Sequence, residues 1–227
     1  MPSLSDYARQ LKRGEGTMGE EYSDCVFTTG FDDIIGVAIF DAEADPKTLA
    51  KARSRSNWPC WKEAMDCELA TLERAGTWTD VPRPSDKNIV GSKWVFRVKR
   101  KADGSVNKYK ARLVAWGFTH IYGVDYFTTF SPVTKLTSFR IILTAAARFD
   151  WDIESFDFNG AYLNGELDDN EEIYMYSPPG YDSDRQTVKR LRKSLYGLKQ
   201  AGWKWYDTLS RALSNLGFSV SQADPGV

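Results

Sequence analysis

The feature that most constrains the fold is an Asp-Gly pair at positions 103–104, inside the segment SKWVFRVKRKADGSVNKYKARLVAW. The runs on either side of this pair alternate in residue type, which is typical of two antiparallel strands joined by a tight turn. Successive side chains of a strand point to opposite faces, so we expect Trp94, Phe96 and Val98 on one face. We predict a twisted hairpin whose other face is cationic and carries Lys93, Arg97, Lys99, Lys108, Lys110 and Arg112.

Hydrophobic periodicity predicts helices on both sides of the hairpin. In NWPCWKEAMDCELATLERAG, Asn57 is a candidate cap, Pro59 suits the first turn, and Gly76 is a stop signal. Helices are also predicted in LTSFRIILTAAARF and LKQAGWKWYDTLSRALSNLG, and strands in WDIESFDF, EEIYMYSP and TVKRLRKSL. This order of elements predicts an α+β fold in which helices pack on a small antiparallel sheet.

Composition divides the chain into two parts. Residues 1–57 are polar and net acidic with one short apolar patch, and we interpret them as a flexible acidic lead-in. The fold is expected to occupy residues 58–227. With 227 residues, 42% of them hydrophobic, the chain can bury one core, or a core plus a small lobe.

Several classes of protein do not fit this sequence. It has no run of eighteen apolar residues and no apolar stretch behind its N-terminal charges, so we expect neither a membrane span nor secretion. We therefore expect an intracellular protein of the cytoplasm or nucleus. The single histidine, His120, and three cysteines without CxxC spacing argue against a zinc site, a disulfide framework and a His-activated nucleophile. The cysteines are interpreted as buried thiols or as incidental.

The net charge of -1 conceals three charge blocks. Residues 87–112 are basic apart from Asp103, residues 150–172 contain acids and no Lys or Arg, and residues 185–204 are basic without an acid. An acidic centre between two basic segments suits a site that holds a phosphate backbone and metal ions together. Solvated faces of alternating sign are the other interpretation.

Seven blocks of the sequence resemble a known family when they are taken in order: GTWTDVP, GSKWVFRVKRKADG, YKARLVAWGF, GVDYFTTFSPV, DFNGAYLNGEL, EEIYMYSPPGY and LRKSLYGLKQA. Over residues 45–227 the chain resembles the reverse transcriptase domain of copia-type long-terminal-repeat retrotransposons. The resemblance implies the fingers and part of the palm of a right-hand polymerase. It also implies RNA-directed DNA polymerase activity, with Mg²⁺ as cofactor, primer–template and deoxynucleotide triphosphates as substrates, and the remaining polyprotein segments as partners.

The resemblance assigns catalytic and metal-binding residues. Asp157 matches the first catalytic aspartate, a ligand of both metal ions in two-metal phosphoryl transfer, and the Phe158 carbonyl is a further metal ligand. Oxygen donors without His or Cys suit Mg²⁺. Tyr162 matches a position beneath the incoming sugar, where an aromatic ring excludes a 2′-hydroxyl. Taken singly, Asp157 also fits a strand-end or capping aspartate, and Tyr162 fits a core aromatic.

The resemblance also assigns residues that bind nucleotide and nucleic acid. Lys110 and Arg112 match triphosphate contacts, since both side chains serve phosphate; a solvated strand face is the alternative. Gln200 matches the position that contacts the incoming sugar and base pair. Lys93 and Arg97 are assigned to the template strand, or to keeping the hairpin soluble.

Family members carry a further pair of adjacent aspartates downstream of the sequence that matches SQADPGV. The sequence stops there, so we expect the pair to be missing and the 227-residue chain alone not to polymerise DNA. Asp168 and Asp169 lie in a polar stretch and are interpreted as a solvated turn. Asp32 and Asp33 lie in an apolar run but precede the hairpin, so their use would require a permuted fold.

Three functions remain open at this level. The first is a polymerase domain, present as a fragment of a reverse transcriptase. The second is a non-catalytic remnant that binds nucleic acid, and the third is a host protein that uses the fold for protein contacts. Salt separates the last two, because phosphate binding weakens steeply as salt rises and an apolar interface does not.

Overall fold

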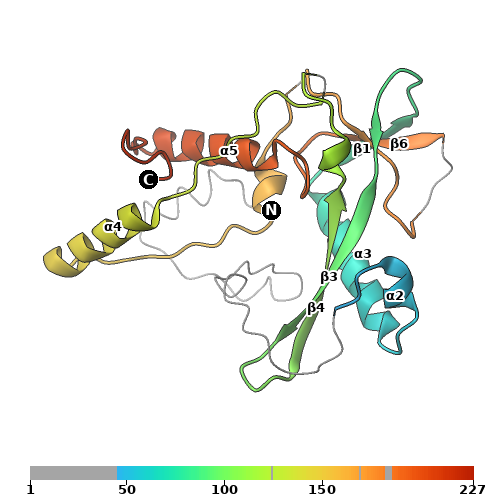
Figure 1. Ribbon diagram of the computed structural model, residues 1–227, viewed down its shortest axis with the longest axis horizontal. Coiled ribbons are helices and arrows are strands. Elements are labelled where there is room, and N and C mark those ends of the chain that lie inside the picture. The colour runs from blue at the N-terminus through green and yellow to red at the C-terminus, as the bar shows by residue number, and fades with distance from the viewer. Residues whose placement is uncertain (1–44, 124, 169, 182–185) are drawn as a thin grey trace.

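The computed structural model describes residues 45–123, 125–168, 170–181 and 186–227 (Figure 1). In chain order the elements are α2 (Leu49–Arg53), α3 (Trp58–Arg74), β1 (Trp78–Pro82), β2 (Ile89–Val90), β3 (Ser92–Arg100), β4 (Val106–Ala115), η3 (Gly117–Thr119), α4 (Leu136–Phe149), η4 (Ala161–Asn164), β5 (Tyr174–Met175), β6 (Thr187–Leu191) and α5 (Ala201–Asn215). This mixture of helices and small sheets is α+β, as predicted. Within these residues, no helix combines the length and apolar character needed to cross a membrane.

The predicted hairpin is formed by β3 and β4. Gly104 in the turn has a φ of 83°, a conformation that glycine adopts without a Cβ clash. The carboxylate of Asp103 accepts hydrogen bonds from the backbone N–H and the hydroxyl of Ser105. Trp94 and Phe96 are buried on one face, so the alternation in the sequence is confirmed.

Helix α3 packs along the apolar face of the hairpin (Figure 1). The Trp61 ring meets the Phe96 ring edge-on at a centroid distance of 5.2 Å and the Tyr109 ring at 4.7 Å. Asn57 does not cap the helix with its side chain, and its amide nitrogen donates to the Tyr109 hydroxyl. Gly76, with a φ of 66°, follows the end of the helix as predicted.

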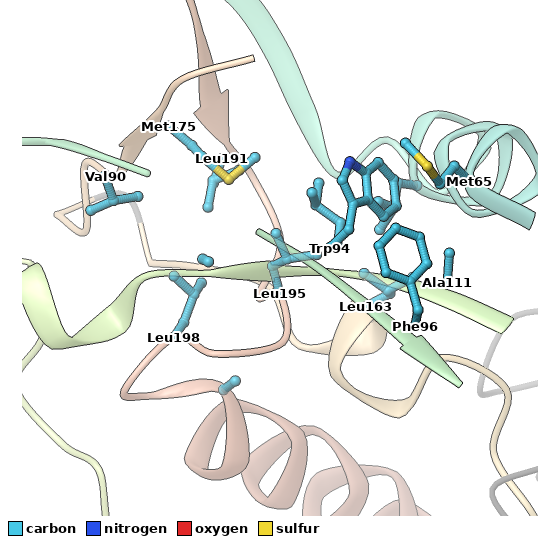
Figure 2. Close-up of a cluster of buried hydrophobic side chains, with 14 of the residues drawn as sticks. Met65, Val90, Trp94, Phe96, Ala111, Leu163, Met175, Leu191, Leu195 and Leu198 are labelled. Atoms are coloured by element: carbon cyan, nitrogen blue, oxygen red, sulfur yellow. The ribbon is translucent and has the colours of Figure 1, made fainter. Parts of the chain in front are cut away.

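The main core lies where α3, the hairpin and the second sheet meet (Figure 2). Its largest members are Trp61, Met65, Leu72, Val90, Trp94, Phe96, Leu113, Leu163, Ile173, Met175, Leu191, Leu195 and Leu198. Burial of a large apolar side chain contributes about 1.5–3 kcal/mol. These contacts therefore hold the two sheets together although no strand is shared between them.

The second sheet is mixed and not antiparallel as predicted. Its strand order is β1-β6-β5-β2, and β2 pairs with β5 in parallel while the other two pairings are antiparallel. The predicted strands in EEIYMYSP and TVKRLRKSL are present as the shorter β5 and β6. The two residues of β2 are too few to show an alternating pattern, so the sequence did not predict the parallel pairing.

Helix α4 has the predicted bounds, but it lies apart from the sheets (Figure 1). Leu136, Ile141 and Phe149 are exposed along it. The strand predicted over residues 151–158 does not form. A strand needs a neighbour to pair its backbone N–H and C=O groups, and no described strand lies beside this segment. The prediction was wrong because an alternating pattern carries no information about a partner strand.

Residues 45–57 include folded structure, although they were predicted to belong to the lead-in. Thr48 accepts a hydrogen bond from the backbone N–H of Lys51 and so caps α2, and Ala52 is fully buried in the core. This short helix packs because its alanine faces α3. The remainder of the predicted lead-in, residues 1–44, lies outside the described residues.

The cysteines of α3 are not buried thiols. Cys60 has an exposed free thiol, and Cys67 is disulfide-bonded. The helix turns Trp61 and Met65 toward the core, which leaves the adjacent Cys60 on the outer side. Cys25 lies outside the described residues.

Candidate nucleotide and nucleic-acid site

Asp157 lies between α4 and η4, and its residue surface is exposed. The next residue, Phe158, packs edge-on against Trp205 of α5 with ring centroids 5.0 Å apart. This contact anchors the chain one residue away from the carboxylate. Helix α5 therefore restricts where Asp157 can lie, although the segment that contains Asp157 has no regular structure.

Tyr162 lies in the short 3-10 turn η4. Gly160 begins the turn with a φ of 60°, and the Ser194 hydroxyl donates a hydrogen bond to the Tyr162 carbonyl. The Tyr162 ring meets the Tyr196 ring at a centroid distance of 4.9 Å and an interplanar angle of 73°. A second aromatic side chain therefore supports the ring that the resemblance assigns to sugar selection.

Arg112 reaches the same tyrosine from the hairpin. Its guanidinium carbon lies 5.0 Å from the centroid of the Tyr196 ring. Burial raises the pKa of Tyr196, Arg112 opposes the rise, and the charge of Asp157 adds to it. Arg112 and Tyr162, which come from separate blocks of the sequence, therefore both contact Tyr196.

Lys110 is not on a solvated strand face, because only 8% of its surface is exposed. Near it, Glu68 of α3 is 4% exposed and accepts a hydrogen bond from the backbone N–H of Leu113 at 3.3 Å. Burial raises the pKa of Glu68 to about 7, although the Leu113 N–H and the charges of Arg112 and Lys110 lower it. A buried carboxyl group that titrates near neutral pH thus lies close to both residues assigned to the triphosphate.

Lys93 and Arg97 lie on the same face of the hairpin as Arg112. Both are exposed, and the register places Arg97 opposite Lys110. An Arg97 nitrogen lies 3.9 Å from a carboxylate oxygen of Asp45. A pair this long and exposed contributes little to stability, so it would compete weakly with a phosphate.

Gln200 is directed into the interior of the protein. Its side chain is fully buried, and its amide nitrogen donates to the Asp125 carbonyl at 2.9 Å. The Asp125 carboxylate in turn accepts from the Asn88 side chain and from the Ile121 N–H. In this structure Gln200 therefore connects the start of α5 to the loop after η3.

Ion pairs neutralise three acids at the end of the acidic block, Asp168, Glu171 and Glu172. The Lys204 ammonium lies 2.7 Å from both Asp168 and Glu171, and Glu172 pairs with Lys87 and Arg190. Asp168 therefore does more than occupy a solvated turn. Asp169, Asp32 and Asp33 lie outside the described residues.

The described residues do not form a Mg²⁺ site by themselves. No group of three or more His, Cys, Asp or Glu residues among them could hold a metal ion. The Asp157 carboxylate and the Phe158 carbonyl are hard oxygen donors of the kind that Mg²⁺ prefers. Two such donors are too few to hold the ion tightly.

Sequence reasoning missed two residues of this site, Tyr196 and Glu68. Tyr196 lies inside the LRKSLYGLKQA block, which marked the segment but not the contact. Glu68 follows Trp61 by seven residues and Met65 by three, so helical spacing already placed it on the buried face of α3.

A protein-family model described as reverse transcriptase (RNA-dependent DNA polymerase) matches residues 75–227. The chain therefore belongs to the reverse transcriptase family. This match confirms the resemblance carried by the seven sequence blocks.

The relatives include Pol polyproteins of plant transposons. The retrovirus-related Pol polyprotein from transposon RE1 of Arabidopsis thaliana is 45% identical over 186 residues, which are 81% of this chain and 12% of that protein. The corresponding polyprotein from transposon TNT 1-94 of Nicotiana tabacum is 37% identical over 82% of this chain and 14% of its own length. An uncharacterised mitochondrial protein of Arabidopsis thaliana is 44% identical over 40% of this chain and 54% of its own length. This chain thus spans only a small part of the polyproteins, and no solved structure matches it.

Proposed function

We propose that this chain forms the fingers and part of the palm of an RNA-directed DNA polymerase. In this proposal it binds a deoxynucleotide triphosphate and a primer–template beside Asp157, and the other segments of a polyprotein complete the enzyme. Arg112 and Lys110 contact the triphosphate and Tyr162 lies under the sugar, while the buried Gln200 supports the start of α5 from the interior. Lys93 and Arg97 contact the template strand.

The observation that carries this proposal is that Arg112 and Tyr162 both contact Tyr196, while Phe158, the residue after Asp157, packs against Trp205 of α5. A nucleotide needs a cation at its phosphates, a flat apolar surface at its sugar and a carboxylate that can hold the metal ion beside the reacting phosphate. In this proposal Arg112, Tyr162 and Asp157 supply these groups.

We also propose that Asp157 and the Phe158 carbonyl are two of the ligands of Mg²⁺. When bound in reverse transcriptases, the ion stabilises the charge that develops on the transferred phosphate. The contribution of this chain is to orient the two oxygens, since the contact of Phe158 with Trp205 restricts the backbone at that point.

Fluorescence anisotropy of a labelled primer–template, and calorimetric titration with dATP, test the proposal on the 227-residue chain. Arg112→Gln should weaken triphosphate binding at least about tenfold, because a hydrogen bond to a charged group contributes about 1.5–3 kcal/mol. Lys110→Gln is preferred to charge reversal, because a carboxylate at so buried a position would unfold the chain.

The matched controls are Lys51→Gln and Arg74→Gln, which remove exposed cations of α2 and α3 on the other side of the hairpin. They should leave both affinities unchanged. Binding of primer–template should also fall steeply as salt rises. Salt-independent binding, or dATP affinity that does not respond to Arg112→Gln and Lys110→Gln, would contradict the assignment of the hairpin.

A further inference from the structure

We infer that Tyr196 is a positioning residue that couples Arg112 of the hairpin to Tyr162, and so sets both triphosphate affinity and the preference for deoxynucleotides. This inference rests on the proposed nucleotide site, since Arg112 and Tyr162 act on a nucleotide only there. Tyr196 touches both residues with one ring: the guanidinium carbon lies 5.0 Å from its centroid and the Tyr162 centroid lies 4.9 Å away.

The backbone of Tyr196 is fixed to the end of β4. The Ala115 N–H donates to the Tyr196 carbonyl at 2.8 Å. The following residue, Gly197, has a φ of 90° and approaches so closely that a Cβ there would lie 2.2 Å from the Ala115 carbonyl oxygen. The Tyr196 ring therefore moves with the strand that carries Arg112.

The same short segment also holds the turn that contains Tyr162. The Ser194 hydroxyl donates to the Tyr162 carbonyl, and the Ser194 N–H donates to the Gly165 carbonyl at 2.8 Å. Only two positions along the chain separate Ser194 from Tyr196. Residues 194–197 thus connect the hairpin to η4 through backbone hydrogen bonds as well as through the Tyr196 ring.

These contacts restrict both nucleotide-binding side chains before a ligand arrives. A guanidinium grips two phosphate oxygens only when its plane is correctly oriented, and an aromatic face beside it limits the orientations it can adopt. The edge contact of Tyr196 similarly limits rotation of the Tyr162 ring. Loss of the Tyr196 ring should therefore reduce triphosphate affinity and sugar discrimination together.

The test measures the affinities of dATP and ATP for the 227-residue chain bound to primer–template. Tyr196→Leu should weaken dATP binding about three- to tenfold, the range that loss of a partly buried cation–π contact implies. It should also bring the ratio of the ATP and dATP dissociation constants closer to one. Tyr196→Phe keeps the ring and should stay within about twofold of the wild type, since Phe also accepts a cation on its face.

The matched control is Tyr176→Leu, because Arg83 lies 5.6 Å from the Tyr176 ring in a similar arginine–tyrosine contact at the end of β5. It should change neither affinity. A double-mutant cycle adds Arg112→Gln: in that background Tyr196→Leu should cause no further loss of dATP affinity but should still reduce sugar discrimination. Should Tyr196→Leu not fold, Tyr196→Met takes its place, since it is also unbranched at Cβ and nearer in length to tyrosine.

The outcomes separate the two proposals. If the wild-type chain binds neither nucleotide, the proposed function fails and the role of Tyr196 falls with it. If the wild type binds dATP but Tyr196→Leu binds it equally well, only the role of Tyr196 is overturned. The role is also overturned if Tyr196→Phe behaves like Tyr196→Leu, or if ATP and dATP lose affinity equally, which is the result expected of a purely structural tyrosine.

Discussion

The ammonium nitrogen of Lys204 lies 2.7 Å from Oε2 of Glu171, and both side chains are buried. Burial alone would lower the pKa of Lys204, but hydrogen bonds to Asp168 and Glu171 outweigh this effect and raise the pKa. Lys204 therefore stays charged at neutral pH. The pair joins α5 to the loop after η4, beside the candidate site.

Lys204→Met should lower the free energy of unfolding by about 3–5 kcal/mol, because it leaves the Glu171 carboxylate buried without its counter-ion. Urea denaturation at neutral pH measures the loss. The control is Arg211→Met on the same helix, which removes an exposed pair with Asp207 and should cost no more than about 0.5 kcal/mol. Equal effects of the two substitutions would show that burial does not govern the pair.

Glu68→Gln should change how stability depends on pH. The carboxyl group titrates near 4.5 when unfolded and at about 7 when folded, so the folded state keeps a proton that the unfolded state releases between these values. Wild-type stability should therefore fall as pH rises from 4.5 to 7, and Glu68→Gln should lack this fall. The variant should gain up to about 3 kcal/mol relative to the wild type between pH 4.5 and pH 8.

Urea denaturation at several pH values between 4.5 and 8 gives this comparison. Glu63→Gln, on the exposed side of the same helix, is the control and should follow the wild type. Parallel curves for wild type and Glu68→Gln would mean that the folded Glu68 titrates as an ordinary glutamate.

Gly197→Ala should destabilise the chain by several times the cost of Gly104→Ala. Both glycines have positive φ, so each substitution carries a backbone strain of about 1–2 kcal/mol. A Cβ at Gly104 meets nothing within 4 Å, whereas at Gly197 it meets the Ala115 carbonyl oxygen at 2.2 Å. Thermal melting of the two variants separates strain from collision, and similar melting temperatures would mean that the contact between β4 and residues 194–197 is loose.

Tyr162→Val should bring the affinities for ATP and dATP together, because the smaller side chain leaves room for a 2′-hydroxyl. The dATP affinity itself should change little, since Arg112 is retained. Titration of the variant with both nucleotides checks this. The control is Tyr176→Val, which removes a tyrosine just after β5. An unchanged preference for dATP would rule out Tyr162 as the residue that selects the sugar.

Local chemistry in the sequence was enough to determine the hairpin and helix α3, which packs beside it. Asp103 and Gly104 form a turn whose hydrogen bonds stay within five residues, and the alternation around them sorts Trp94 and Phe96 to one face. The spacing of Trp61 and Met65 likewise fixes the buried face of α3. These features depend on neighbours along the chain, which a sequence displays directly.

Only the tertiary structure decided the state of Lys110, Gln200 and residues 151–158. A lysine on an alternating strand looks solvated until other segments cover it, and a glutamine near a helix start looks available until its amide finds the Asp125 carbonyl. Residues 151–158 have the pattern of a strand, but the described chain offers no strand to pair with them.

The candidate site also has a part that the sequence determined and a part that only the tertiary structure decided. Sequence blocks alone identified Arg112, Tyr162 and Asp157, because the family resemblance marks each of them by its immediate neighbours. The contacts of Arg112 and Tyr162 with Tyr196 were decided by the fold, since they depend on residues 194–197 packing against the end of β4. Packing between distant segments is set by the shapes and hydrogen bonds of the whole core, which no single stretch of sequence contains.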